Sequence, residues 1–158
     1  MVRGFEPHDH GNCIADAISA AEQRCATRSL RLTAVRRQVL EILLQEHVAL
    51  GAYDILEHLR QAGFNSQPPV AYRALEFLVT NGFAHKVERL NAFIACSYPG
   101  ESHSPAFMIC SRCDVVAETR STPAKGTLGA AARSAGFRIE RTVVEAEGLC
   151  PACQDEAS

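Results

Sequence analysis

The sequence has no long apolar segment, and this absence argues against a membrane-spanning protein. No run of apolar residues approaches the 18 or more that a membrane helix requires. The first residues also lack the apolar stretch and small-residue cleavage site of a secretory signal. The 158 residues are 47% hydrophobic and 22% charged, which is typical of one globular domain or two small ones. We therefore expect a protein of the cytoplasm with no membrane partner.

The sequence also lacks the motifs of several common enzyme classes. It has no Ser/His/Asp pattern, no glycine-rich loop that could hold phosphates, and no thioredoxin-like C-x2-C expected to open a helix. A zinc hydrolase or a thiol oxidoreductase is the remaining enzymatic alternative. Such an enzyme needs an open metal position beside a general base. The one candidate base near the cysteines, Glu118, is assigned below to a metal, so we expect no enzymatic activity.

A strong net charge is absent as well, because the formal charge is only −2. The charges are unevenly placed, however. Residues 23–40 contain five arginines and no acidic residue: Arg24, Arg28, Arg31, Arg36 and Arg37. A local basic stripe can contact phosphates even in a slightly acidic chain. The same stripe could equally be a solvated helix face.

Apolar periodicity predicts helices in the first half of the chain, followed by a β-hairpin. The helices are expected at residues 13–28, 34–46, 52–62 and 68–81, and the two strands at residues 83–88 and 92–96. Helices followed by a hairpin are typical of a winged helix-turn-helix, in which the later helix enters the major groove of DNA. The hairpin would form the wing.

The second half predicts a small α/β unit after a turn-rich link. Strands are expected at residues 106–110, 114–118 and 137–148, with a helix near 123–135. The sequence thus predicts the α+β fold class with four segments. They are a flexible tail (1–12), a winged-helix DNA-binding domain (13–96), a hinge (97–105) and a C-terminal α/β domain (106–158).

Four of the seven cysteines form two C-x2-C pairs. The pairs are Cys110 with Cys113 and Cys150 with Cys153. Four thiolates are a complete tetrahedral set for Zn²⁺, and a domain of about 60 residues has a core small enough to need a structural metal. We therefore predict a structural zinc knuckle. An iron–sulfur cluster and a redox dithiol pair are the alternatives.

A second candidate metal site combines His85, Cys96, His103 and Glu118. If the hairpin turns at residues 90–91, His85 lies directly opposite Cys96, with Cβ atoms about 5 Å apart. His103 lies in the hinge and Glu118 ends a strand of the second domain. Taken singly, each histidine could be structural and Glu118 a solvated strand end. Together, the nitrogen, sulfur and oxygen ligands suit zinc better than magnesium or calcium.

Several segments resemble the ferric uptake regulator family, and its zinc uptake regulator branch most closely. They comprise Leu32-Thr33, residues 52–56, residues 68–75, residues 82–88 and both cysteine pairs, so the resemblance covers about residues 13–153. It implies a zinc-responsive repressor of zinc-uptake genes that binds an AT-rich inverted repeat in double-stranded DNA. It also implies a homodimer whose C-terminal domain is the dimerisation domain.

The resemblance also implies two zinc ions per subunit. The structural ion falls on Cys110, Cys113, Cys150 and Cys153, and the sensory ion on His85, Cys96, His103 and Glu118. Within the family, sensing of iron, manganese or peroxide is the alternative. Cys96 distinguishes the zinc branch, because the iron and manganese sensors prefer nitrogen and oxygen ligands.

Candidate DNA contacts follow from the same resemblance. Tyr72 and Arg73 match the recognition-helix pair, and Tyr53 matches a residue near DNA. Arg36 and Arg37 of the basic stripe are further candidates. Two positions depart from the family pattern: Val70-Ala71 stands where Thr-Val is usual, and Gly51 stands where a serine usually caps the helix.

Overall fold

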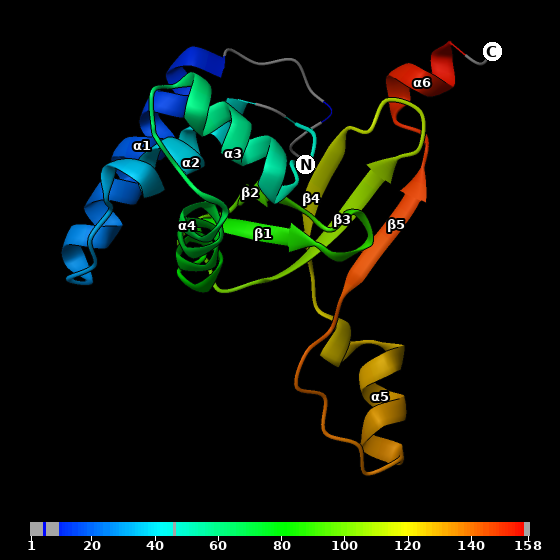
Figure 1. Ribbon diagram of the computed structural model, residues 1–158. Helices are drawn as coiled ribbons and strands as arrows, with labels where there is room; N and C mark the ends of the chain where they lie inside the picture. Colours follow the sequence, from blue (N-terminus) through cyan, green and yellow to red (C-terminus); the bar gives the residue numbers. More distant parts are fainter. Residues whose placement is uncertain (1–4, 6–9, 46, 157–158) are drawn as a thin grey trace.

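The computed structural model describes residues 5, 10–45 and 47–156, and four helices make up most of its first half (Figure 1). They are α1 (His10–Thr27), α2 (Ala34–Gln45), α3 (Ala52–Gln61) and α4 (Pro68–Thr80). Most of the tail expected at residues 1–12 lies outside the described residues, and α1 begins at His10, earlier than expected. None of the described helices is long and apolar enough to cross a membrane.

Local sequence signals explain where three of these helices begin. Thr33 Oγ1 accepts a hydrogen bond from a main-chain N–H in the first turn of α2 at 3.3 Å, as a helix N-cap does. Gly51 has no side chain to cap α3, and instead its N–H donates to Asp54 Oδ2 at 3.2 Å. Pro68 and Pro69 occupy the first turn of α4, where a missing N–H costs nothing.

One apolar core holds the four helices together. Its fully buried members include Ile55 and Leu59 of α3 and Leu75 and Leu78 of α4. Burial of each such side chain contributes about 1.5–3 kcal/mol. This burial fixes the rotation of α4 about its axis, so that its opposite face is exposed.

The hairpin contains β1 (Ala84–Val87) and β2 (Ala92–Ala95), joined by the 3-10 turn η1 (Glu88–Leu90). The expected pairing of His85 with Cys96 is wrong, because His85 pairs with Ile94. The connection is longer than a two-residue turn, since η1 and a left-handed Asn91 (φ 47°) both lie in it. The register shifts by two residues, so Cys96 still shares a face with His85.

The second half contains a three-stranded sheet with β3 (Ser104–Cys110) at its centre. It runs antiparallel to β4 (Val116–Ser121) and parallel to β5 (Val144–Gly148). The elements η2 (Pro123–Lys125) and α5 (Thr127–Ser134) connect β4 to β5, and α6 (Pro151–Asp155) follows β5. Figure 1 shows α5 at the far end of the sheet from α6. The predicted α+β class is confirmed.

The last strand is shorter than the predicted run of residues 137–148. The ladder between β3 and β5 begins at the pair Ala106–Val144, and Pro105 before it has no N–H to extend the ladder. Residues 137–143 therefore form no strand, and Phe137 is 67% exposed. By contrast, β3 is longer than the predicted strand of residues 106–110. It begins at Ser104, inside the segment predicted as a hinge.

A second apolar cluster joins the two halves. Val87 and Ile94 of the hairpin pack with Phe107, Ile109 and Val116 of the C-terminal sheet. Figure 1 shows the hairpin between the helices and this sheet. The wing is therefore packed against the second half of the chain.

The segment between α2 and α3 adds main-chain contacts between the halves. Val48 pairs with Val115, next to β4, and Leu50 pairs with Phe93 of the hairpin. The Val116 N–H also donates to His47 O at 2.7 Å. One short segment thus links the hairpin to β4.

Candidate metal centres

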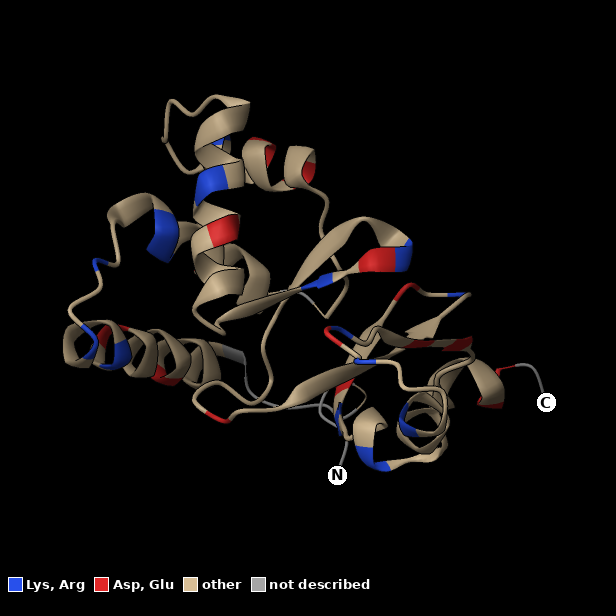
Figure 2. Cartoon of the chain, turned by 90° about the horizontal axis from the view of Figure 1, so that it is seen from below, with Lys and Arg blue, Asp and Glu red and all other residues tan. Residues whose placement is uncertain are grey.

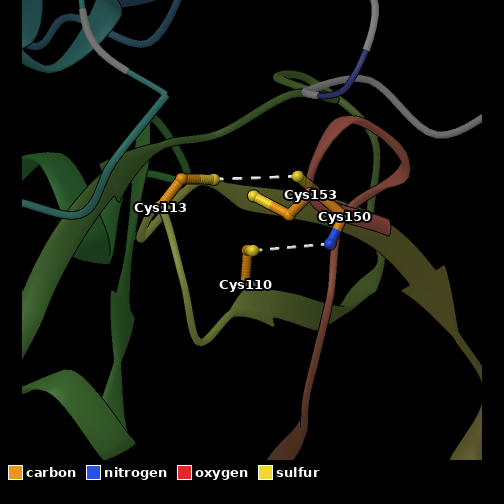
Figure 3. Close-up of side chains that lie close together, drawn as sticks. All are labelled: Cys110, Cys113, Cys150 and Cys153. Carbon is orange, nitrogen blue, oxygen red and sulfur yellow. Dashed lines mark hydrogen bonds between the residues drawn. The ribbon is translucent and has the colours of Figure 1, made fainter. Parts of the chain in front are cut away.

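Four cysteine sulfurs meet at one end of the C-terminal sheet (Figure 3). Cys110 ends β3, Cys113 lies in the following turn, Cys150 precedes α6 and Cys153 lies within α6. Their Sγ atoms all lie within 4.8 Å of one another, and those of Cys113 and Cys150 are 3.7 Å apart. Four sulfurs held at about 2.3 Å from one zinc ion would lie about 3.8 Å apart. The spacing thus fits a tetrahedral zinc site.

The surroundings of the four sulfurs give the thiols different pKa values. Main-chain N–H groups of Cys150 and Cys113 donate to Cys110 Sγ and lower the pKa of that thiol to about 6. Burial raises the pKa of Cys153 to about 12. A divalent cation at the centre would favour the thiolate form of all four. With four sulfurs as ligands, the site would have no open position for a substrate.

The second C-x2-C pair does open a helix, so the expectation that neither pair would do so is wrong. Cys150 is the N-cap residue of α6, and Pro151 follows it in the first turn. Both sulfurs of this pair nevertheless converge with Cys110 and Cys113. The geometry is that of a four-sulfur cage rather than an isolated dithiol.

A second group of four candidate ligands lies where the hairpin meets the sheet. His85 belongs to β1, Cys96 follows β2, His103 precedes β3 and Glu118 lies in β4. Each offers a ligand atom, and these atoms lie within 4.8 Å of one another. Glu118 Oε1 is 2.8 Å from His103 Nε2 and 3.1 Å from His85 Nε2. Cys96 Sγ lies 3.6 Å from His103 Nε2. The structure therefore brings together all four residues named from the sequence.

Both imidazoles present Nε2 to this centre. His103 Nδ1–H donates to the main-chain oxygen of Glu101 at 2.8 Å, the kind of contact that orients metal-bound histidines. His85 Nε2 is buried, and its position near Glu118 does not have the direction of a hydrogen bond. A buried nitrogen that makes no hydrogen bond fits the role of a metal ligand.

The two other members of this group have opposite pKa shifts. Burial raises the pKa of Glu118, but the nearby His85 imidazole, the Ser97 N–H at 2.7 Å and His103 together bring it below its usual value. Glu118 is therefore a carboxylate. Burial, followed by the negative charge of Glu118, raises the pKa of Cys96 to about 12. Cys96 thus becomes a thiolate ligand only when a cation replaces its proton.

The four candidate ligands come from both halves of the chain. His85 lies in the wing and Cys96 at its end, whereas His103 directly precedes β3 and Glu118 lies in β4 of the C-terminal sheet. An ion held by all four would fix the angle between the two halves. The site can thus act on the shape of the molecule without any catalytic step.

The candidate DNA contacts lie mainly on the exposed surface of the helices. Tyr53 of α3 is 72% exposed and Tyr72 of α4 is 50% exposed. Arg73 is also exposed, and its Nε–H donates to Pro69 O at 3.3 Å. Their contact with DNA stays a prediction.

The arginines of the basic stripe face different surroundings. Arg36 lies over the Phe77 ring at 3.8 Å, and Arg37 pairs with Glu22 at 3.2 Å. Arg24 lies over the Phe83 ring at 4.8 Å, and its Nη1 is buried, so this nitrogen is not available to a phosphate. Figure 2 shows lysines and arginines distributed over both halves of the chain. Contacts with DNA therefore have to come from a few neighbouring basic residues, because the basic side chains are not gathered on one half of the chain.

Sequence reasoning missed the groups that surround the second site. The Ser97 N–H donates to Glu118 Oε2, and the Tyr98 N–H donates to Cys96 Sγ at 3.4 Å. These are main-chain donors, so residue type carries no signal for them. The sequence marks Ser97 and Tyr98 only by their position one and two residues after Cys96.

Comparison with known proteins identifies relatives over most of the chain. The chain is 39% identical over 139 residues to the zinc uptake regulation protein of Escherichia coli, covering 87% of this chain and 81% of that protein. No family model matches the chain. A solved structure described as a zinc uptake regulator complexed with zinc and DNA is 38% identical, with a TM-score of 0.85. That match covers 92% of this chain and 98% of the other.

Two further solved structures differ from each other in state. The holo form of XcZur matches with a TM-score of 0.78 at 38% identity, covering 87% of this chain and 96% of that one. Its apo form matches with a TM-score of only 0.51 at 37% identity, covering 89% and 97%. Because the identities are nearly equal, the difference reflects the arrangement of the chain. The described fold is closer to the holo arrangement.

Proposed function

Because the chain belongs to the zinc uptake regulator branch of the ferric uptake regulator family, we propose that it is a zinc-responsive transcriptional repressor. It binds operator DNA as a zinc-loaded homodimer and controls genes for zinc uptake. It acts in the cytoplasm, where DNA is accessible, and performs no catalysis. The relatives carry the names of regulators, which supports this role.

The main support for this proposal is one group of converging side chains: His85, Cys96, His103 and Glu118. The two nitrogens, one sulfur and one carboxylate oxygen form a set that suits zinc. When bound, zinc supplies a divalent charge that all four ligands share. His85 and Cys96 then hold the wing in a fixed orientation to His103 and Glu118. This is the regulatory site.

Zinc bound by the four ligands changes the DNA affinity because it favours one arrangement of the two halves. An ion shifts a conformational equilibrium only if it binds one state more tightly than the other. The arrangement of the halves in this structure, which we call closed, brings His103 and Glu118 within reach of His85 and Cys96, and we infer that a rotation of the halves would separate them. The higher similarity to holo XcZur than to apo XcZur supports a closed, ligand-competent state for this chain.

We assign the second zinc ion to the four-cysteine site, which gives two ions per subunit. Cys110 and Cys113 lie at the end of β3, whereas Cys150 and Cys153 flank the start of α6. An ion shared by these pairs connects segments about 40 residues apart and stabilises a domain with a small core. Its role is structural, since four protein ligands complete its coordination.

DNA recognition falls to α4 and its exposed face. Arg73 can donate two hydrogen bonds to guanine O6 and N7 in the major groove, and Tyr72 can contact a thymine methyl or a phosphate. In a homodimer, two copies of α4 would read half-sites about 34 Å apart, which matches an inverted repeat. Arg37 and Tyr53 supply further contacts to the DNA backbone.

The homodimer uses the far end of the C-terminal half. Leu128 of α5 is 55% exposed, and Phe137 and Val143 in the segment after α5 are 67% and 49% exposed. Figure 1 shows α5 projecting beyond the sheet. Apolar side chains of this size on one region indicate an interaction surface. A second copy of the chain is the partner that a symmetric operator requires.

The substitution Cys96→Ser tests the regulatory site. It removes the only sulfur ligand of that site and leaves the four-cysteine site intact. We expect a folded dimer that retains one zinc ion per subunit but no longer binds operator DNA in response to zinc. Zinc content after dialysis and fluorescence anisotropy with an inverted-repeat duplex, selected by the wild-type protein from a random pool, measure both properties.

The substitution Cys13→Ser is the matched control, because Cys13 is exposed and lies far from both groups in sequence. It should keep two zinc ions and full operator binding. Zinc-dependent binding that persists in Cys96→Ser would place the regulatory site elsewhere. Repeating the wild-type titration with iron and manganese identifies the metal, and a response to iron at lower free concentration than zinc would refute zinc sensing.

A further inference from the structure

The segment between two of the proposed ligands must be ordered for the regulatory site to exist. Cys96 and His103 are separated by the hinge loop, defined here as residues 97–102, which has no strand or helix. Ordering the backbone of each loop residue costs about 1–2 kcal/mol of conformational entropy. Any contact that orders this loop before metal binding therefore raises the metal affinity.

Arg120 contacts the hinge loop at two points. Its Nη1–H donates to Glu101 Oε2 at 2.6 Å, and its guanidinium lies 4.7 Å from the centre of the Tyr98 ring. Arg120 lies two residues after Glu118 in β4, so both side chains leave the same face of the strand. The same strand thus presents a proposed ligand and an arginine that contacts the loop.

Both contacted residues touch the proposed ligands directly. The main-chain oxygen of Glu101 accepts the His103 Nδ1–H at 2.8 Å, which turns Nε2 towards the site. The Tyr98 N–H donates to Cys96 Sγ at 3.4 Å, and the Tyr98 ring meets the His103 ring edge-on at 5.7 Å. Each contact of Arg120 therefore orders a residue that orients a ligand.

We propose that Arg120 is a positioning residue of the regulatory site, which orders the hinge loop before the metal binds. Arg120 does not ligate the metal, and it acts through Glu101 and Tyr98. This inference rests on the proposed function, because it assumes that His103 and Cys96 are ligands. It adds to that function a residue whose role is to raise the affinity of the site by preorganisation.

The expected effect is moderate because Arg120 and Glu101 are both more than half exposed. An exposed ion pair contributes little by itself, and an exposed cation–π contact adds a similar amount. Loss of both contacts should weaken zinc binding at the regulatory site about three- to tenfold. Zinc at the four-cysteine site should be unaffected.

The substitution Arg120→Met tests the proposal, since methionine keeps an unbranched apolar side chain but loses the charge and the N–H donors. Zinc affinity is measured without DNA, by competition with a chelator, in protein whose four-cysteine site is already filled with zinc. Hydrogen exchange of the hinge loop is measured in that same one-zinc form. We expect weaker zinc binding and faster exchange of the Tyr98 and Glu101 amides, which donate hydrogen bonds to Cys96 Sγ and Tyr98 O.

Three further variants separate positioning from general stabilisation. Arg120→Lys keeps a cation and should restore part of the affinity. Glu101→Gln removes the same ion pair from the loop side, so it tests the proposal even if Arg120→Met fails to fold. Arg60→Met removes a comparable exposed Arg–Glu pair, between Arg60 and Glu57 of α3, and should leave both zinc affinity and hinge exchange unchanged.

The outcomes are distinguishable. Wild-type zinc affinity and hinge exchange in both Arg120→Met and Glu101→Gln would overturn the role of Arg120. A wild-type protein that binds no second zinc ion would instead refute the proposed regulatory site itself. Equal weakening in Arg60→Met would show that any lost surface ion pair has this effect, and would also refute a positioning role.

Discussion

Glu118 has the most connected side chain of the regulatory site. It is 1% exposed, its Oε1 faces both imidazoles, and its Oε2 accepts the Ser97 N–H. A buried carboxylate is costly unless charges or hydrogen bonds compensate for the lost water. Here the imidazoles and a main-chain N–H provide that compensation and keep the carboxylate ionised. The proposed site thus carries a negative charge before any metal arrives.

Cys96 gives the site a predicted pH dependence. Its pKa of about 12 means that the thiol is protonated at pH 8 and below, and zinc must replace that proton. One proton released per zinc ion weakens binding about tenfold for each unit by which pH falls. We expect zinc affinity at the regulatory site to fall about tenfold from pH 8 to pH 7, measured by chelator competition. Equal affinities at both pH values would contradict thiolate ligation by Cys96.

Arg73 gives the DNA-binding face a predicted specificity. Its exposed guanidinium can form two hydrogen bonds to a guanine, and one such pair contributes about 1–3 kcal/mol of discrimination. We expect Arg73→Ala to weaken operator binding by about 1–3 kcal/mol and to affect a random duplex much less. Anisotropy titrations at one fixed salt concentration compare the two duplexes. Equal losses on both would make Arg73 a phosphate contact.

Among the elements, the wing has a second attachment to the C-terminal half. Both Glu145 carboxylate oxygens accept main-chain N–H groups at the wing tip, from Glu88 at 2.6 Å and from Arg89 at 2.9 Å. Arg89 also pairs with Glu147 of β5 at 2.5 Å, and Arg141 pairs with Glu88. These contacts involve no proposed metal ligand. The wing can therefore stay near β5 when the regulatory site is empty.

The substitution Glu145→Gln tests this attachment. Glutamine keeps one acceptor oxygen but loses the charge and the second acceptor, so we expect a loss of about 1–2 kcal/mol in the free energy of unfolding. Hydrogen exchange of the Glu88 and Arg89 amides should become faster. Glu147→Gln, in the same strand, removes only an exposed ion pair and should cost less than about 1 kcal/mol. Similar losses in the two variants would argue against a specific role for Glu145.

Local sequence signals predicted most of the elements correctly. Thr33, the Pro68-Pro69 pair and the apolar spacing of Leu75 and Leu78 are read from neighbouring residues, and each has the predicted effect in the structure. The wing register was wrong because the 3-10 turn and the left-handed Asn91 have no strong local signature. Since the error was two residues, the predicted face of His85 and Cys96 was still correct.

Contacts between distant segments could not be predicted. Glu145 and the wing tip are 57 residues apart in sequence, and Arg120 and Glu101 are 19 apart. Nothing in the local composition marks either pair, because charged residues are common on strands and loops. The four-ligand group was found in advance because histidine and cysteine are rare and chemically selective. The short α6 was missed because it spans only residues 151–155.

At the scale of the whole molecule, two kinds of contact hold the halves together. The apolar cluster around Val87 and Phe107 and the Glu145 contacts need no metal, whereas His85, Cys96, His103 and Glu118 would add a metal-dependent link. A ligand that changes a 1:99 equilibrium to 99:1 must bind one state about 10⁴-fold more tightly. The metal-independent contacts reduce the shift that zinc must supply.

The most direct test of the account uses the reciprocity of coupled binding. If zinc at the regulatory site tightens operator binding, operator DNA must tighten zinc binding by the same factor, typically about 5- to 150-fold. The measurement is the zinc affinity of wild-type protein with a filled four-cysteine site, determined by chelator competition with and without saturating operator duplex. We expect tighter zinc binding with operator, by the same factor by which zinc tightens DNA binding. An identical zinc affinity in the two titrations would contradict it.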